Sequence, residues 1–244
     1  MELRRERLVY DGPGGPFEGW LCRDEGRAGP LPGVMVVHAF RGQSEFEVDK
    51  AAALAELGYV GFAADLYGQG RRAASPDEAR ALMAELDGDR PLLSARVNAA
   101  LDTLKAQPLA DAGRTAAIGF CFGGKCVLDL ARSGADVQGV VSFHGLYDAP
   151  PRSGPEPAHP PIRAAILALH GWDDPLAPPE HVAALARELT ARGADWQLHA
   201  YGHTGHAFTN PAAQSPEQGL AYAPRADARA WSAMRGFLAE VLGG

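Results

Sequence analysis

Cys121 lies in the segment of the sequence that says most about chemistry, Gly-Phe-Cys-Phe-Gly-Gly at residues 119–124. An apolar run, Thr115–Phe120, leads into this segment, and a stretch with helical spacing follows it. Gly-x-Cys-x-Gly-Gly between a strand and a helix is a nucleophile elbow with cysteine in place of serine. The sulfur would lie near a helix N-terminus, whose dipole favours thiolate over thiol. The segment therefore predicts a nucleophilic cysteine.

The acid that a catalytic triad requires is predicted after the apolar run Ile166–His170. In α/β-hydrolases the order along the chain is nucleophile, acid, histidine. The next residues, 171–175, read Gly-Trp-Asp-Asp-Pro. Asp174 matches the usual Gly-x-x-Asp turn, with proline directly after it, and is preferred to Asp173. An aspartate at this strand end can hold the tautomer of a histidine.

The histidine is predicted on the loop after the apolar run Trp196–Tyr201. His206 is preferred because a glycine precedes it and a phenylalanine follows two residues on. His203 is interpreted as a solvated loop residue. A metal site formed by His199, His203 and His206 is a weaker alternative, because a strand and a loop at this spacing give no single ligand face. No metal is expected.

An oxyanion hole follows from the same fold. One donor is predicted to be the backbone N–H of Phe122, directly after the nucleophile. The second is predicted on the loop that follows the apolar run Val34–His38, where the N–H of Phe40 is the best candidate. With Cys121 as nucleophile, such a site would cleave an ester through a covalent thioester intermediate.

Short apolar runs alternate with longer segments of helical period, which is typical of a parallel sheet covered by helices. We expect an α/β-hydrolase fold with a mostly parallel central sheet and helices on both faces. The expected strands are Phe17–Cys22, Val34–His38, Val60–Asp65, Thr115–Phe120, Val137–Phe143, Ile166–His170 and Trp196–Tyr201. The expected helices are 46–57, 76–86, 92–106, 124–132, 179–192 and 224–242.

A single domain spanning residues 1–244 is expected, since 244 residues with 46% hydrophobic composition can bury one substantial core. The proline-rich stretch 148–161 could be an interdomain linker. It falls between two expected strands of one sheet, so an excursion or partial lid over the carboxyl edge of the sheet is the favoured interpretation.

Charge and composition exclude several partner classes. The net charge is −7 and no basic run occurs, so nucleic acid is not an expected partner. The N-terminus is charged where a signal peptide is apolar, and no apolar stretch approaches the ~20 residues of a membrane span. Three cysteines suit a reducing compartment better than a disulfide framework. We expect a cytoplasmic protein, either a monomer or a homodimer.

Taken together, these motifs resemble those of the dienelactone hydrolase family. The resemblance rests on the cysteine elbow, on Asp-Leu-Tyr-Gly at 65–68, on Gly-Trp-Asp-Asp-Pro at 171–175 and on Gly-His-Ala-Phe at 205–208. It covers nearly the whole chain, and it implies a Cys-His-Asp triad, no cofactor, and hydrolysis of a small lactone or ester. The family also places a glutamate near the thiol, where this chain has Ala39.

The resemblance further implies two arginines that clamp a substrate carboxylate, and this chain has Gln69 and Asn210 at those positions. Arg71 and Arg72 lie close to the first position and could substitute, although ordinary surface positions are the preferred interpretation. Tyr67 and Phe208, with Phe40 and Phe122, would add apolar wall. A neutral, moderately apolar ester or lactone is therefore the expected substrate.

Two other functions remain open from the sequence. Residues 119–125, Gly-x-x-x-x-Gly-Lys, fit the first part of a phosphate loop, but Cys126 stands where a serine or threonine should hold magnesium. The chain could also be a catalytically idle binding protein on a hydrolase scaffold. The natural substrate is not predicted by any motif.

Overall fold

The computed structural model describes residues 2–150 and 161–243. Its centre is an eight-stranded sheet with the order β1-β2-β4-β3-β5-β6-β7-β8. The strands are β1 (Leu3–Tyr10), β2 (Phe17–Asp24), β3 (Leu31–Val37), β4 (Val60–Ala64), β5 (Ala110–Phe120), β6 (Gly139–Phe143), β7 (Ala165–Gly171) and β8 (Trp196–Tyr201). All strand pairs from β4 to β8 are parallel, and β1 and β2 join the sheet antiparallel.

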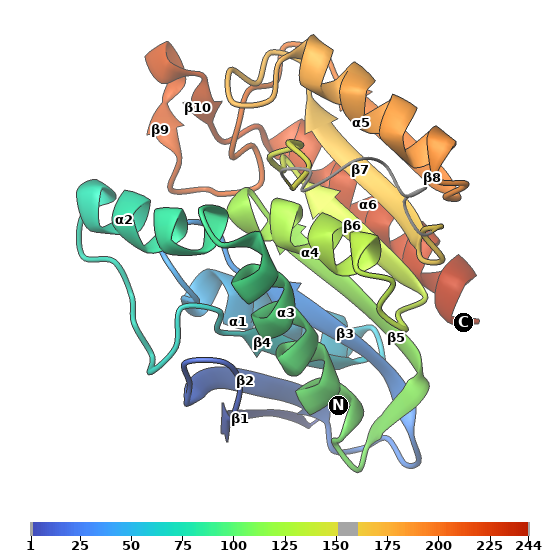
Figure 1. Cartoon of the computed structure of the whole chain (residues 1–244). Coiled ribbons are helices and arrows are strands. Elements are labelled where there is room, and N and C mark those ends of the chain that lie inside the picture. Colours follow the sequence, from blue (N-terminus) through green and yellow to red (C-terminus); the bar gives the residue numbers. More distant parts are fainter. Residues whose placement is uncertain (1, 151–160, 244) are drawn as a thin grey trace.

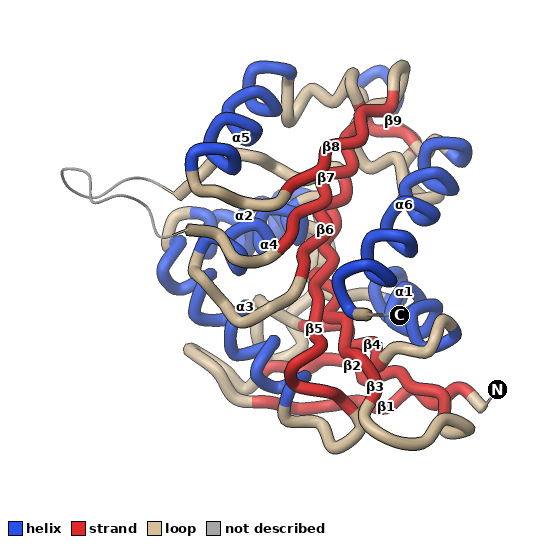
Figure 2. Tube along the Cα trace, turned by 90° about the vertical axis from the view of Figure 1, so that its right-hand side faces the viewer, coloured by secondary structure: helices blue, strands red, loops and turns tan. Residues whose placement is uncertain are grey.

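Six α-helices cover the two faces of this sheet in the described residues, as Figure 2 shows in edge view. One face carries α1 (Glu45–Glu56) and α6 (Pro224–Leu242), and the other carries α2 (Pro76–Asp87), α3 (Arg90–Lys105), α4 (Phe122–Arg132) and α5 (Pro179–Ala191). The predicted mostly parallel sheet with helices on both faces is confirmed.

The central strands are apolar on both faces because helices cover both. In β3, Val34 and Val36 pack toward the face that carries α1 and α6, whereas Met35 and Val37 pack toward α3. All four side chains are fully buried. This alternation follows from the two-residue period of a strand.

The helix starts follow local chemistry. Ser44 begins α1 with a complete capping box, in which Glu47 accepts hydrogen bonds from the backbone N–H and the hydroxyl of Ser44. Ser75 and Asp89 cap α2 and α3 through their side-chain oxygens, and each of these helices has proline in its first turn. These signals explain why the predicted helix bounds lie within two residues of the observed ones.

The main departure from the predicted elements is β1, which was not expected. Its sequence carries four charged residues and only its last residue, Tyr10, is buried. β1 lies at the edge of the sheet and pairs on one side only, with β2. An edge strand with an exposed face lacks the apolar pattern that marks a central strand. None of the described helices is long and apolar enough to cross a membrane.

Parallel strands bring their carboxyl ends to one edge of the sheet. Here β5, β6, β7 and β8 are consecutive neighbours, so the residues that follow them meet at this edge. Most of the proline-rich stretch predicted as an excursion or lid, residues 151–160, lies outside the described residues.

Candidate active site

Cys121 forms a tight elbow between β5 and α4. Its φ of 54° and ψ of −115° lie outside the regions that a residue with a side chain prefers. Its backbone N–H donates to the carbonyl oxygen of Phe143 on β6, at 3.0 Å. Strain of this kind costs about 1–3 kcal/mol and persists only where the surroundings impose it. The turn leaves Cys121 partly exposed, while Cys22 and Cys126 are buried.

The glycines of the elbow are required by close backbone approach. A Cβ atom on Gly119 would lie 2.0 Å from the carbonyl oxygen of Gly123, and one on Gly123 would lie 2.2 Å from that of Val37. A Cβ on Gly124 would lie 2.6 Å from Oγ of Ser142. Glycine is thus required on both sides of Cys121, because the strand and helix backbones touch here.

Asp174 and His206 meet at the ends of β7 and β8. Nδ1 of His206 lies 2.8 Å from Oδ2 of Asp174, and both side chains are almost completely buried. The other carboxylate oxygen of Asp174 accepts the N–H of Leu176 at 2.8 Å. Asp173 is exposed, as are His199 and His203. The structure therefore brings together the preferred acid and the preferred histidine of the sequence analysis.

The protonated form of His206 is favoured by its surroundings. Burial lowers the pKa of this ring, but the charge of Cys121 and the hydrogen bond to Asp174 outweigh that effect and raise the pKa to about 10. A hydrogen bond to the side chain of Cys121 also raises this pKa, and Nε2 is buried without a nitrogen or oxygen partner in the described part of the chain. It is therefore available for proton exchange with Cys121.

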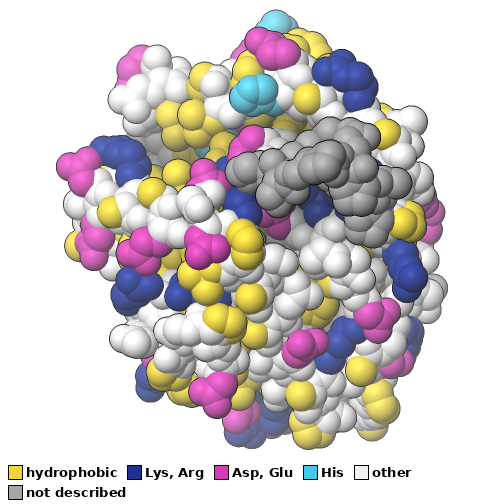
Figure 3. Space-filling model, in the orientation of Figure 1, with side chains coloured by type: hydrophobic (Ala, Val, Ile, Leu, Met, Phe, Trp, Pro, Cys, Tyr) yellow, Lys and Arg dark blue, Asp and Glu magenta, His cyan; other side chains and the backbone are white. Residues whose placement is uncertain are grey.

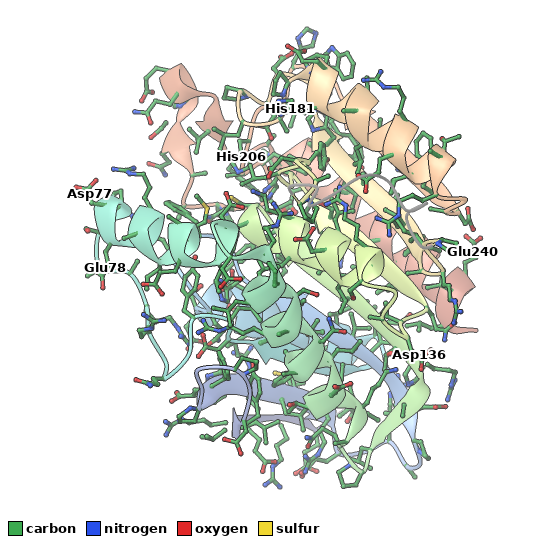
Figure 4. The ribbon with its side chains drawn as sticks, viewed as in Figure 1. Asp77, Glu78, Asp136, His181, His206 and Glu240 are labelled. Atoms are coloured by element: carbon green, nitrogen blue, oxygen red, sulfur yellow. The ribbon has the colours of Figure 1, made fainter. Side chains whose placement is uncertain are left out.

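The backbone of His206 is held by a small hairpin that the sequence did not predict. The N–H of His206 donates to the carbonyl of Gly219 at 2.7 Å, and its carbonyl accepts from Ala221 at 3.2 Å. These contacts come from the segment of β9 (Gln214–Ser215), a 3₁₀ turn (Pro216–Gln218) and β10 (Leu220–Ala221). Figure 4 shows His206 inside the molecule, whereas the labelled acidic residues Asp77 and Glu240 lie at its periphery.

The two predicted oxyanion donors lie at the same edge of the sheet. Phe122 is the first residue of α4, and Phe40 follows β3. Neither N–H donates a hydrogen bond to another described residue. The hydroxyl of Tyr67 donates to the carbonyl of Phe40 at 2.8 Å, which holds the Phe40 peptide in place. Both donors are thus free to bind an oxyanion.

The four predicted substrate-binding residues differ in placement. Tyr67 is buried, and the charge of Cys121 is among the influences that raise the pKa of its hydroxyl, after burial and the charge of Cys126. Phe208 is fully buried behind the ring of His144, with ring centroids 5.1 Å apart, so its side chain does not reach an open surface. Gln69 is exposed, and Oδ1 of Asn210 accepts the N–H of Ala212 within a turn.

Arg71 and Arg72 are engaged within the protein. The guanidinium of Arg71 donates to the carbonyl of Tyr67 and lies 3.4 Å from Glu85. Arg72 donates to Oε1 of Gln43 and to the carbonyl of Arg71. Both arginines therefore have partners that a substrate carboxylate would have to replace.

Lys125 cannot serve a phosphate loop in this conformation. Its side chain is 2% exposed, and Nζ lies 2.6 Å from Asp87 and 2.9 Å from Asp148. Further along α4, Asp129 accepts two hydrogen bonds from Arg90. The lysine thus belongs to a buried ion-pair network that joins α4 to its neighbours, which argues against the nucleotide-binding alternative.

His144 is a residue of this site that the sequence analysis missed. It follows β6 directly, it is 2% exposed, and its ring lies 5.1 Å from that of His206 at an angle of 68°. Its place after the apolar run Val137–Phe143 is the same signal that identified Cys121, Asp174 and His206. That signal could have found it.

Two large apolar side chains are exposed beside Asp174. Trp172 and Leu176, beside Asp174 on the loop that leaves β7, are each 46% exposed. Hydrophobic side chains gather at the end of the molecule where α2 and α5 face the β9–β10 hairpin (Figure 3). This surface suits an uncharged, partly apolar ligand.

A cysteine elbow after β5, an acid after β7 and a histidine after β8 define an α/β-hydrolase fold. The Dienelactone hydrolase family matches residues 17–242, and the chain belongs to this family. The protein is thus a hydrolase, as its relatives are, and the resemblance stated from the sequence is confirmed.

Three similar proteins illustrate the relationship. A solved structure titled m3DLH is 41% identical, with a TM-score of 0.92, and the match covers 99% of this chain and 100% of that one. A dienelactone hydrolase-like promiscuous phosphotriesterase from metagenomic libraries is 36% identical, with a TM-score of 0.91, over 99% of both chains. A probable 2-oxo-3-(5-oxofuran-2-ylidene)propanoate lactonase from Bradyrhizobium is 30% identical over 189 residues, 74% of each protein.

Proposed function

We propose that this protein hydrolyses small neutral esters or lactones through a triad of Cys121, His206 and Asp174. The observation that carries the proposal is the buried 2.8 Å contact between His206 and Asp174 beside a strained cysteine elbow. It accounts for a histidine whose Nδ1 is held by a carboxylate and which is kept protonated next to a sulfur. No cofactor or metal enters the proposed reaction.

In the acylation half, the thiolate of Cys121 attacks the carbonyl carbon of the ester, and the carbonyl electrons move to the oxygen. The N–H groups of Phe40 and Phe122 stabilise that oxyanion. When the intermediate collapses, the carbon–oxygen bond to the leaving group breaks. The leaving alkoxide takes the proton from Nε2 of His206, and a thioester to Cys121 remains.

In the deacylation half, neutral His206 takes a proton from water, and the resulting hydroxide attacks the thioester carbonyl. Collapse of the second intermediate breaks the carbon–sulfur bond and returns the thiolate. The product leaves as a carboxylic acid, which gives its proton to bulk water, and the imidazolium formed with the proton from the attacking water is the starting state of His206. A thioester is more reactive toward water than an oxygen ester, so this half-reaction need not be slow.

A neutral substrate is proposed because the site offers no free cation for a carboxylate. Gln69 and Asn210 are uncharged, and Arg71 and Arg72 have partners within the protein. Burying an unpaired carboxylate costs several kcal/mol. The exposed Trp172 and Leu176 favour an apolar acyl or alcohol group instead.

A chromogenic acyl ester and a short lactone, each assayed with the wild type and with Cys121→Ala, test the proposal. We expect turnover by the wild type and loss of at least about three orders of magnitude in the variant. Mass spectrometry of enzyme quenched during turnover should show the acyl group on Cys121. Full activity of Cys121→Ala would refute the proposal, and no activity of the wild type on the whole panel would favour an idle binding protein.

Neutral phosphotriesters are a second candidate substrate class. One relative, 36% identical, is named as a promiscuous phosphotriesterase, and a phosphotriester is uncharged like the proposed ester substrates. The same thiolate and oxyanion donors would act on phosphorus. An aryl dialkyl phosphate in the same assay tests this class. Equal rates with the wild type and with Cys121→Ala would show that the thiolate of Cys121 does not act on phosphorus.

A further inference from the structure

The residues Phe143 and His144, at the end of β6, contact two of the proposed catalytic residues, Cys121 and His206. The carbonyl of Phe143 accepts the N–H of Cys121 at 3.0 Å. The ring of His144 packs edge-to-face against the ring of His206, with centroids 5.1 Å apart. One dipeptide therefore touches the nucleophile through its backbone and the base through a side chain.

Two hydrogen bonds fix the position of His144, and its backbone is strained. Its backbone N–H donates to the carbonyl of Leu169 on β7 at 2.8 Å. Its Nε2 lies 2.8 Å from the hydroxyl oxygen of Thr209, three residues after His206. Its φ of 37° is unusual for a residue with a side chain, so the surrounding contacts hold the backbone in a strained conformation.

The hydrogen bond to Asp174 alone leaves His206 incompletely oriented. That bond holds one ring atom, Nδ1, so coupled changes of χ1 and χ2 can still tilt the ring about Nδ1 and move Nε2. His144 is the one aromatic ring found against His206 in residues 2–150 and 161–243. A rigid neighbour at right angles limits that rotation.

We propose that His144, locked by Thr209, is a positioning residue that sets the distance and direction from Nε2 of His206 to the sulfur of Cys121. It touches neither substrate nor the reacting atoms. The dipeptide acts as a spacer: its backbone holds the elbow and its imidazole holds the base. This inference rests on the triad of the proposed function and names a residue that supports it.

His144 can do this only as a neutral ring, and its environment keeps it neutral. Burial and the positive charge of His206 hold the pKa of His144 well below its usual range, and Lys50 on α1 adds to the effect. The groups that face His206 itself are Cys121, Asp174, His144 and His170. A second positive charge beside the imidazolium is thereby avoided.

The test compares Thr209→Val, His144→Phe and His144→Ala with the wild type. Thr209→Val keeps shape and deletes the hydroxyl, and His144→Phe keeps a ring and deletes its nitrogens. We expect kcat to fall about tenfold in each of these two and about 100-fold in His144→Ala, with KM within twofold. Alkylation of Cys121 by iodoacetamide should slow at neutral pH, and its pH profile should shift upward.

The matched control is Thr115→Val, which removes the hydroxyl of another buried threonine, in the middle of β5 and six residues before Cys121. It should lower Tm at most, with unchanged kcat and alkylation profile. If Thr209→Val and His144→Phe behave like this control, His144 is an ordinary core residue and the inference is wrong. Should His144→Ala fail to fold, the two conservative variants decide.

Failure of this inference differs from failure of the proposed function. Cys121→Ala is measured in the same series. If it is inactive while the His144 and Thr209 variants match the wild type, the triad stands and only the spacer role falls. If Cys121→Ala keeps full activity, the triad itself is wrong.

Discussion

The two carboxylate oxygens of Asp174 have different partners: Oδ2 lies 2.8 Å from Nδ1 of His206, and Oδ1 accepts the N–H of Leu176 on the same loop as Asp174. The neighbouring Asp173 is exposed to solvent. Two aspartates that are adjacent in the sequence therefore differ in environment: Asp174 is the buried partner of His206, whereas Asp173 is a charge at the surface.

We expect Asp174→Asn to lower kcat by roughly three to four orders of magnitude, because the amide cannot hold the histidine in the required tautomer and charge state. Asp173→Asn should keep most activity. Steady-state kinetics on one chromogenic ester, with circular dichroism to verify folding, makes the comparison. A larger loss in Asp173→Asn would overturn the choice of acid.

Thiol labelling should single out Cys121. Burial is the largest of the influences that raise the pKa of Cys126 well above its usual range, and burial also raises that of Cys22 to about 11, so neither is reactive at neutral pH. Iodoacetamide followed by peptide mapping should find the first label on Cys121, with activity lost in proportion. Cys126→Ser serves as the control and should inactivate at the wild-type rate. Inactivation that tracks a label on Cys126 would contradict the prediction.

His206 should titrate far from its ordinary pKa of 6.5. Its pKa of about 10 lies above neutrality, so the ring is protonated below that pH and loses its proton only as the pH rises through it. In Cys121→Ala the sulfur's charge is absent and burial counts for more, so the pKa should fall. NMR of ring-labelled histidine measures both values, with His206→Gln to assign the signal. An unchanged pKa in Cys121→Ala would show that the sulfur does not act on this ring.

Substrate charge should matter at this site. For a matched pair that differs only in a free carboxylate or its methyl ester, we expect kcat/KM to favour the neutral compound at least tenfold, because an unpaired carboxylate is costly to bury. A preference for the anion that disappears in Arg71→Gln or Arg72→Gln would mean that these arginines leave their partners to bind substrate. Equal rates would place the charged group outside the site.

Gly119→Ala should destabilise the fold by about 3 kcal/mol or more, because the new Cβ would lie 2.0 Å from a backbone oxygen of Gly123. Gly236→Ala is the matched control. It lies within α6, where a Cβ meets no atom within 4 Å, and should stabilise by about 0.5–1 kcal/mol. Urea unfolding reports both values. Similar stability of the two variants would show that the elbow tolerates a side chain.

The sequence alone predicted those strands and site residues for which a single local pattern determines the structure. Apolar runs predicted β3 to β7, since strands buried on both faces carry few polar residues. The edge strand β8 was also predicted, although none of its residues is fully buried. Residue order along the chain predicted Cys121, Asp174 and His206, because parallel strands deliver their last residues to one edge. β1 was missed for the opposite reason: an edge strand with exposed charges has no apolar run to read.

Side-chain direction could not be predicted from sequence spacing. Phe208 lies two residues after His206, yet it packs behind His144 in the core. Asn210 was expected to bind substrate, but its side-chain oxygen Oδ1 accepts a hydrogen bond from the N–H of Ala212 and closes a turn. Loop conformation decides both outcomes, and it depends on long-range contacts such as that between His206 and Gly219.

The hairpin that grips the backbone of His206 has a consequence for protein engineering. Because the peptide groups of Gly219 and Ala221 hold the backbone of His206, these two contacts do not depend on the exposed side chains nearby. Exposed positions such as Ala212 and Glu217 are thus open to randomisation in a mutant library, with the backbone of His206 left in place. Selection for new substrates could change the surface beside His206 through these positions while its backbone contacts stay constant.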